Sequence, residues 1–124
     1  MSEAKSVLVV DDSRVSRLMT RQYIMSEHPD WNVVEAATGE EALALIQAGG
    51  LTPVLIMLDV NMPGIGGLAA AEQLLTLCPG VRICLATANV QNATRNRASE
   101  LGIGFMEKPI TEARIHQVLA ALEA

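Results

Sequence analysis

The sequence predicts an α/β domain in which five short strands alternate with five helices around a parallel sheet. Short apolar runs recur along the chain, and longer segments with apolar residues at helical spacing lie between them. The run at residues 54–58 is apolar throughout, which is typical of a strand that is covered on both faces. These observations together indicate a doubly wound (βα)5 fold, with helices on both sides of the sheet.

The first two helices are marked by their expected caps. The predicted strands are Ser6–Val10, Asn32–Ala36 and residues 54–58, 82–86 and 104–106. Ser13 is a candidate N-cap for a helix that runs to about Ser26, ahead of His28-Pro29. Thr38 is a candidate N-cap for the second helix, which carries glutamates in its first turn and ends at Gly49-Gly50.

The three later helices are predicted at residues 68–77, 90–101 and 111–122. Pro79-Gly80 closes the first of them, Gly102 closes the second, and Thr111 is a candidate N-cap of the third. No linker, repeat or low-complexity segment interrupts the pattern, so we expect residues 1–124 to form a single domain.

Composition limits the possible partners. The formal net charge of −5, from 14 acidic and 9 basic residues, disfavours non-specific binding to nucleic acid or to anionic membranes. No apolar run approaches the roughly 20 residues that a membrane span requires. We therefore expect a cytoplasmic protein without membrane insertion or direct contact to nucleic acid.

Polar side chains follow four of the five predicted strands. Asp11 and Asp12 follow the first strand, Asp59 the third, Thr87 the fourth and Lys108 the fifth. Ligands of open parallel sheets bind beyond the carboxyl ends of the strands, so we expect these groups to converge. An aspartate after a strand is often only a turn former or a helix cap, and the joint pattern is what favours a site.

The chemistry of this set favours Mg²⁺ and a phosphoryl group. Three neighbouring carboxylates repel one another unless a cation intervenes, and oxygen ligands without His or Cys suit Mg²⁺. A carboxylate such as Asp59 can serve as the covalent phosphoryl acceptor. Lys108 would pair with one phosphoryl oxygen, and the Thr87 hydroxyl would donate to another.

Four motifs resemble the receiver domain of bacterial two-component response regulators, most closely a stand-alone chemotaxis-type regulator, over essentially the whole chain. They are the run Val7-Leu8-Val9-Val10-Asp11-Asp12-Ser13, the run Asp59-Val60-Asn61-Met62-Pro63-Gly64 with Gly67, the pair Thr87-Ala88 and the pair Lys108-Pro109. The resemblance implies the flavodoxin-like strand order 2-1-3-4-5. It also implies that Asp59 is the phosphoacceptor.

Further roles follow from the resemblance alone. It implies that Asp12 and Asp59 bind Mg²⁺ directly, that Asp11 acts mainly through water, and that the backbone carbonyl of Asn61 completes the protein ligands. It also implies that Lys108 contacts the phosphoryl group beside a cis peptide to Pro109.

The resemblance implies a switch made by Thr87 and Phe105, although Phe105 is equally well interpreted as a plain core residue. Asn61 and Asn89 occupy positions near which the family tunes hydrolysis of the aspartyl phosphate. Gly66 stands where many members carry Asp, which gives its loop unusual freedom.

The function implied is that of a phosphorylation switch, not of an enzyme with a separate substrate; the protein would only catalyse its own phosphorylation and dephosphorylation. The donor would be a sensor histidine kinase, a phosphotransfer protein or a small molecule such as acetyl phosphate. A downstream protein would bind the face of the fourth helix, fifth strand and fifth helix, and a homodimer on activation is possible.

Three alternatives stay open. A Mg²⁺-dependent phosphohydrolase would be expected to carry an Asp-x-Asp pair, whereas Val60 and Asn61 follow Asp59. A nucleotide- or flavin-binding module would need a phosphate loop after the first strand, where Asp11 and Asp12 stand. A receiver that no longer depends on phosphorylation would serve as a scaffold.

Overall fold

The computed structural model describes residues 5–62, 64, 66–88 and 91–123, and strands and helices alternate along this part of the chain. All sheet pairings are parallel, in the order β2-β1-β3-β4-β5, which confirms the predicted fold and strand order. The elements are β1 (Ser6–Val10), α1 (Arg14–Glu27), β2 (Asn32–Ala36), α2 (Gly39–Gln47), β3 (Leu55–Asp59), α3 (Gly66–Leu77), β4 (Arg82–Thr87), α4 (Asn92–Leu101), β5 (Gly104–Glu107) and α5 (Glu112–Glu123).

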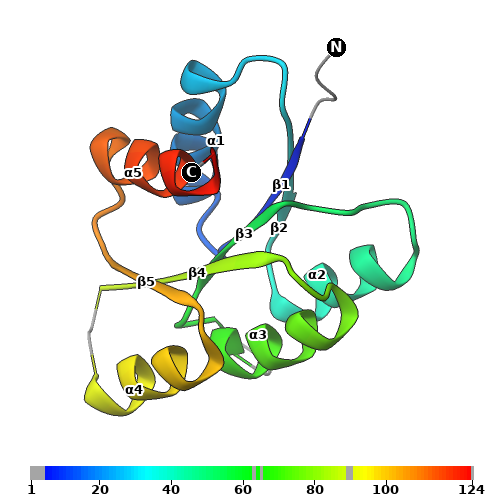
Figure 1. Cartoon of the computed structure of the whole chain (residues 1–124), viewed down its shortest axis with the longest axis vertical. Coiled ribbons are helices and arrows are strands. Elements are labelled where there is room, and N and C mark those ends of the chain that lie inside the picture. Colours follow the sequence, from blue (N-terminus) through cyan, green and yellow to red (C-terminus); the bar gives the residue numbers. More distant parts are fainter. Residues whose placement is uncertain (1–4, 63, 65, 89–90, 124) are drawn as a thin grey trace.

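Helices cover both faces of the sheet. Figure 1 shows α1 and α5 on one face and α2, α3 and α4 on the other. Successive strand side chains point to opposite faces, and β1 follows this rule. Val7 and Val9 join the core under α1 and α5, whereas Leu8 and Val10 join the core under the other three helices. The sheet is therefore an internal layer between two mainly aliphatic cores.

The predicted caps are present at the first two helices. The Ser13 hydroxyl accepts a hydrogen bond from the Ser16 amide at 3.2 Å, and the Thr38 hydroxyl accepts one from the Glu41 amide at 3.0 Å. Gly102 ends α4 in the left-handed conformation, with φ at 72°. These local signals fix where α1, α2 and α4 begin or end.

Several predicted boundaries were wrong by one or two residues. β3 covers Leu55–Asp59 instead of residues 54–58, and both β4 and β5 continue one residue further than predicted. The ladder pairs Asp59 with Ala86 and Thr87 with Glu107, so the backbone stays in the sheet after the apolar run has ended. Helix α3 begins at Gly66 and α4 at Asn92. Val90, the predicted start of α4, lies outside the described residues, as do Pro63 and Asn89.

Candidate functional site

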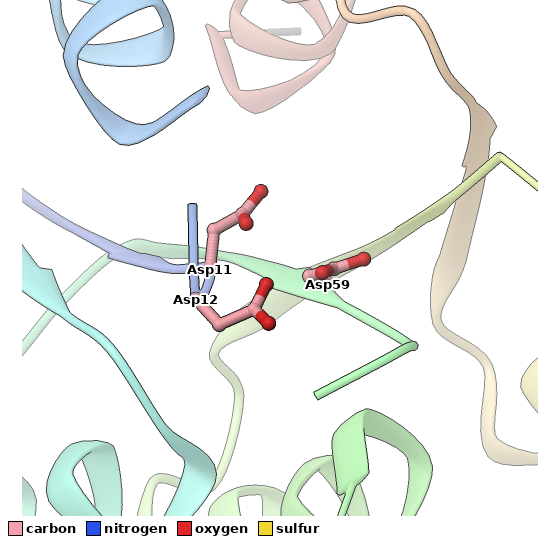
Figure 2. Close-up of side chains that lie close together, drawn as sticks. All are labelled: Asp11, Asp12 and Asp59. Carbon is pink, nitrogen blue, oxygen red and sulfur yellow. The ribbon is translucent and has the colours of Figure 1, made fainter. Parts of the chain in front are cut away.

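Three aspartates meet at the carboxyl ends of β1 and β3. Asp11 and Asp12 follow β1 directly, and Asp59 is the last residue of β3. One carboxylate oxygen from each of the three lies within 4.8 Å of the others. Asp11 and Asp59 are only 3% and 5% exposed, whereas Asp12 is exposed. Figure 2 shows the three side chains side by side at this end of the sheet.

Asp11 is held by the start of α1. Its Oδ1 accepts a hydrogen bond from the Ser13 amide at 2.9 Å, and its Oδ2 accepts one from the Ser16 hydroxyl at 2.8 Å. Its own amide donates to the Ala36 carbonyl on β2 at 3.1 Å. Ser16 was not among the predicted site residues, and its only sequence signal is a hydroxyl on the first turn of the helix after Asp11.

Lys108 reaches this cluster from the loop after β5. Its Nζ lies 3.1 Å from Asp11 Oδ2 and 3.4 Å from Asp59 Oδ1, and its amide donates to the Thr87 carbonyl at 2.8 Å. The peptide between Lys108 and Pro109 is cis, as the resemblance implied. Burial lowers the pKa of the Lys108 ammonium, but its pairing with the two aspartates outweighs that effect, and the net pKa is raised. The lysine is therefore a fixed positive charge at neutral pH.

The Asp59 carboxyl has a raised pKa. Burial is the largest cause and the nearby charge of Asp11 is the second, while Lys108 and the amide of Asn61 act in the opposite direction. One ammonium does not balance three carboxylates, so the cluster carries an excess of negative charge. All the donor atoms are oxygens from carboxylates, the ligand type that hard divalent cations prefer. The residues present thus fit a divalent metal site.

Thr87 and Asn61 are joined through their side chains. Thr87 is 1% exposed at the end of β4, and its hydroxyl accepts a hydrogen bond from Asn61 Nδ2 at 3.1 Å. The Asn61 amide in turn approaches Asp59 Oδ1 at 3.4 Å. The sequence predicted a role for the backbone of Asn61, whereas its side-chain contact to Thr87 was missed.

Phe105 lies on the strand next to Thr87. The register pairs Leu85 with Phe105 and Thr87 with Glu107, so Phe105 is a diagonal neighbour of Thr87 on the same face of the sheet. The ring is partly buried against the core under α2, α3 and α4. The Arg95 guanidinium lies 5.6 Å from its centroid, within the range of a cation–π contact.

The loop after Asp59 depends on glycine. Gly64 and Gly66 have φ values of 84° and 78°, a region that other residues rarely adopt, so the freedom predicted for this loop is used. A Cβ on Gly67 would lie 2.2 Å from the Asp59 carbonyl oxygen. The first turn of α3 can therefore pack directly against the backbone that carries Asp59.

The family comparison agrees with this arrangement. The model of the response regulator receiver domain matches residues 7–120. The chain belongs to the response regulator receiver domain family. Receiver domains are signalling modules, and the acidic pocket of Asp11, Asp12 and Asp59 is where such a domain would carry its phosphoryl group. No helix in the described part of this receiver domain has the length and apolar character needed to cross a membrane.

The receiver domain is similar to proteins of different lengths. It is 33% identical over 116 residues to Protein CcdB of Bacillus subtilis (strain 168), covering 92% of this chain and 93% of that protein. It is 46% identical over 108 residues to a protein-glutamate methylesterase/protein-glutamine glutaminase of Maricaulis maris (strain MCS10), covering 83% of this chain but only 26% of that protein. A solved response regulator from Burkholderia pseudomallei, described with a phosphorylated aspartic acid, calcium ion and citrate, superposes with a TM-score of 0.81 at 28% identity, covering 95% of this chain and 66% of that one.

Proposed function

We propose that this receiver domain is the phosphoacceptor switch of a two-component phosphorelay, and that Asp59 takes the phosphoryl group. The observation that carries the proposal is the position of Asp59, beside two other carboxylates and 3.4 Å from the ammonium of Lys108. The phosphorylated aspartic acid described in the Burkholderia pseudomallei relative supports it. In this proposal residues 1–124 act as a single cytoplasmic receiver domain.

The proposed metal is Mg²⁺, held by Asp12 and Asp59 directly, by Asp11 through water and by the carbonyl of Asn61. When bound, Mg²⁺ would supply positive charge to the phosphoryl oxygens. An Asp59 oxygen attacks phosphorus in line, the new O–P bond forms, and the bond to the donor breaks. The leaving group is a neutral imidazole when the phosphohistidine ring carries a proton on its other nitrogen, or acetate when the donor is acetyl phosphate. Water later attacks the phosphorus, which restores the carboxylate and releases inorganic phosphate.

Lys108 and Thr87 have complementary parts in this reaction. Lys108 already contacts Asp59 Oδ1, so a small movement brings its ammonium to a phosphoryl oxygen. The Thr87 hydroxyl, whose oxygen accepts a hydrogen bond from Asn61 Nδ2 in the resting site, donates its proton to a second phosphoryl oxygen as it moves toward the phosphoryl group. Phe105, which shares the face of Thr87, then turns into the space that Thr87 leaves. Phosphorylation shifts the populations of two pre-existing conformations. A partner protein then binds the changed surface of α4, β5 and α5.

In this proposal the phosphodonor protein docks beside Lys108, which lies 3.4 Å from Asp59. A shallow apolar pocket lies between the start of α1 and the loop after Lys108, lined by Val15, Met19 and Ile110 among others. Val15 is 67% exposed and Met19 is 42% exposed. A donor histidine must come within bonding distance of Asp59, so its protein would cover this pocket. We propose a sensor histidine kinase or a phosphotransfer protein as that donor.

Intact-protein mass spectrometry tests the proposal. Incubation with acetyl phosphate and Mg²⁺ is expected to add the mass of one phosphoryl group to the wild type, and neither EDTA-treated protein nor Asp59→Asn should gain it. Asp30→Asn is the matched control, because Asp30 is an exposed aspartate in the turn between α1 and β2. No uptake by the wild type, or equal uptake by Asp59→Asn, would contradict the assignment of Asp59. Steady turnover of a separate phosphate ester would instead support a phosphohydrolase.

A further inference from the structure

Ser16 makes a contact that none of the roles above requires. Its hydroxyl donates to Asp11 Oδ2 at 2.8 Å, the same oxygen that lies 3.1 Å from Lys108 Nζ. The other oxygen of Asp11 is occupied by the Ser13 amide at 2.9 Å. Asp11 is 3% exposed, so its carboxylate depends on protein donors more than on bulk water.

The backbone of Ser16 is held from both sides along α1. The Ser16 amide donates to the capping hydroxyl of Ser13 at 3.2 Å. The Ser16 carbonyl accepts a hydrogen bond from the hydroxyl of Thr20, which is 1% exposed, at 2.9 Å. The first turn of α1 therefore presents the Ser16 hydroxyl to Asp11 without depending on Lys108.

Lys108 must contact different partners before and after phosphorylation. In the resting site it is the second donor to Asp11 Oδ2, and in the phosphorylated site it must pair with a phosphoryl oxygen. When it leaves Asp11, a buried carboxylate oxygen loses its ammonium partner. An unsatisfied buried acceptor is costly, and hydrogen bonds to charged groups are among the strong ones.

We propose that Ser16 is a positioning residue that keeps Asp11 Oδ2 satisfied while Lys108 turns to the phosphoryl group. This inference rests on the proposed function and goes beyond it. It gives Ser16, a side chain on α1, a role at the step in which Lys108 moves from Asp11 to the phosphoryl group. Without the Ser16 hydroxyl, Asp11 Oδ2 in the resting site still has the Lys108 ammonium as a partner, so the resting state loses little stability. The loss is larger in the phosphorylated state, in which Lys108 has moved to the phosphoryl group.

The test compares two binding constants in each variant by titration calorimetry. The first is the affinity for Mg²⁺ alone, and the second is the affinity for beryllofluoride, which mimics the phosphoryl group, at saturating Mg²⁺. For Ser16→Ala we expect the Mg²⁺ affinity to stay within about twofold of wild type and the beryllofluoride affinity to fall roughly tenfold, the scale of one lost hydrogen bond to a charged group. Ser16→Thr keeps a hydroxyl and should restore most of the loss.

Two further variants make the mechanism falsifiable. Ser26→Ala removes a serine hydroxyl from the same helix, where it bonds the Tyr23 carbonyl, and should bind both ligands like wild type. In a Lys108→Ala background, Ser16→Ala should have little additional effect on beryllofluoride binding, because no lysine is left to change partners. Thermal unfolding in EDTA checks that each variant is folded.

The outcomes separate the inference from the function it rests on. Unchanged beryllofluoride affinity in Ser16→Ala, or an equal loss of Mg²⁺ and beryllofluoride affinity, would overturn the role of Ser16 while leaving Asp59 as the acceptor. An undiminished effect of Ser16→Ala in the Lys108→Ala background would also overturn it. Wild-type protein that binds Mg²⁺ but no beryllofluoride would overturn the proposed function itself, and the inference with it.

Discussion

Replacing Asp59 by Asn should stabilise the metal-free protein. The carboxylate oxygens of Asp11, Asp12 and Asp59 lie within 4.8 Å of one another, which at an effective dielectric constant of about 20 corresponds to a repulsion of about 3.5 kcal/mol per pair. The attraction between Asp59 and the Lys108 ammonium at 3.4 Å is about 5 kcal/mol on the same scale. Two repulsions therefore exceed one attraction by about 2 kcal/mol, and the exposure of Asp12 reduces its share.

We expect Asp59→Asn to raise the free energy of unfolding in EDTA by about 1 to 2 kcal/mol, and the melting temperature by roughly 4 to 8 °C. In saturating Mg²⁺ we expect the wild type to be more stable than Asp59→Asn. At a metal concentration of about 100 times Kd, binding to the native state stabilises the wild type by about 2.7 kcal/mol, and the variant should gain little of this. Removal of the metal is thus expected to change which of the two proteins is more stable.

Urea unfolding with and without Mg²⁺ is the appropriate assay, with Asp30→Asn as a control that removes an exposed aspartate away from the cluster. The control should behave like wild type in both conditions. Lower stability of Asp59→Asn in EDTA would refute the electrostatic reasoning. Equal stabilisation of wild type and Asp59→Asn by Mg²⁺ would refute the assignment of Asp59 as a ligand.

Three other predictions follow from the same contacts. Burial and the charge of Asp11 raise the pKa of Asp59 above its usual 3.8, so the folded state holds that proton more tightly. In EDTA the contribution of this carboxyl to stability should fall as pH rises above 3.8, and the advantage of Asp59→Asn in urea unfolding should grow over the same interval. Gly67→Ala should lower the free energy of unfolding by more than about 2 kcal/mol, because its Cβ would lie 2.2 Å from the Asp59 carbonyl oxygen, whereas Gly50→Ala, with open space around it, should cost far less in the same assay. Burial raises the pKa of the Cys84 thiol to about 11, so iodoacetamide at pH 8 should label Cys84 only after unfolding, and peptide mass mapping of labelled folded protein would detect the contrary.

The fold could be predicted because local and global signals agree. The caps at Ser13 and Thr38 and the apolar run of β3 each indicated the element that is present. The strand ends were less predictable. Asp59 and Thr87 belong to the ladder although they are polar, and an apolar pattern cannot show hydrogen bonds that continue beyond it. Two of the predicted site residues, Asp59 and Thr87, therefore lie where the predicted strand ends were wrong.

The sequence predicted which strand ends meet at the site, but it did not predict which side-chain atoms contact one another there. The rule for parallel sheets brought Asp11, Asp59 and Lys108 together, as the structure does. Which carboxylate oxygen accepts a hydrogen bond from each donor depends on the rotation of α1 about its axis and on side-chain rotamers. Ser16 and the side chain of Asn61 were missed for this reason, since neither lies at a position that strand or helix periodicity distinguishes.

The resting geometry makes activation an exchange of partners. Lys108 is bound to Asp11 and Asp59, so the ammonium that would pair with a phosphoryl oxygen already has two partners. The Thr87 hydroxyl oxygen accepts a hydrogen bond from the side-chain amide of Asn61, which helps to hold Thr87 in its resting position. The contact of Lys108 with a phosphoryl oxygen then replaces existing contacts, and the net free energy of switching is smaller than the strength of the new contact suggests. A small net difference is what lets one covalent group shift the populations of two shapes. We therefore expect the resting contacts of Lys108 with Asp11 and Asp59 to set the free energy of switching together with the contacts that the phosphoryl group creates.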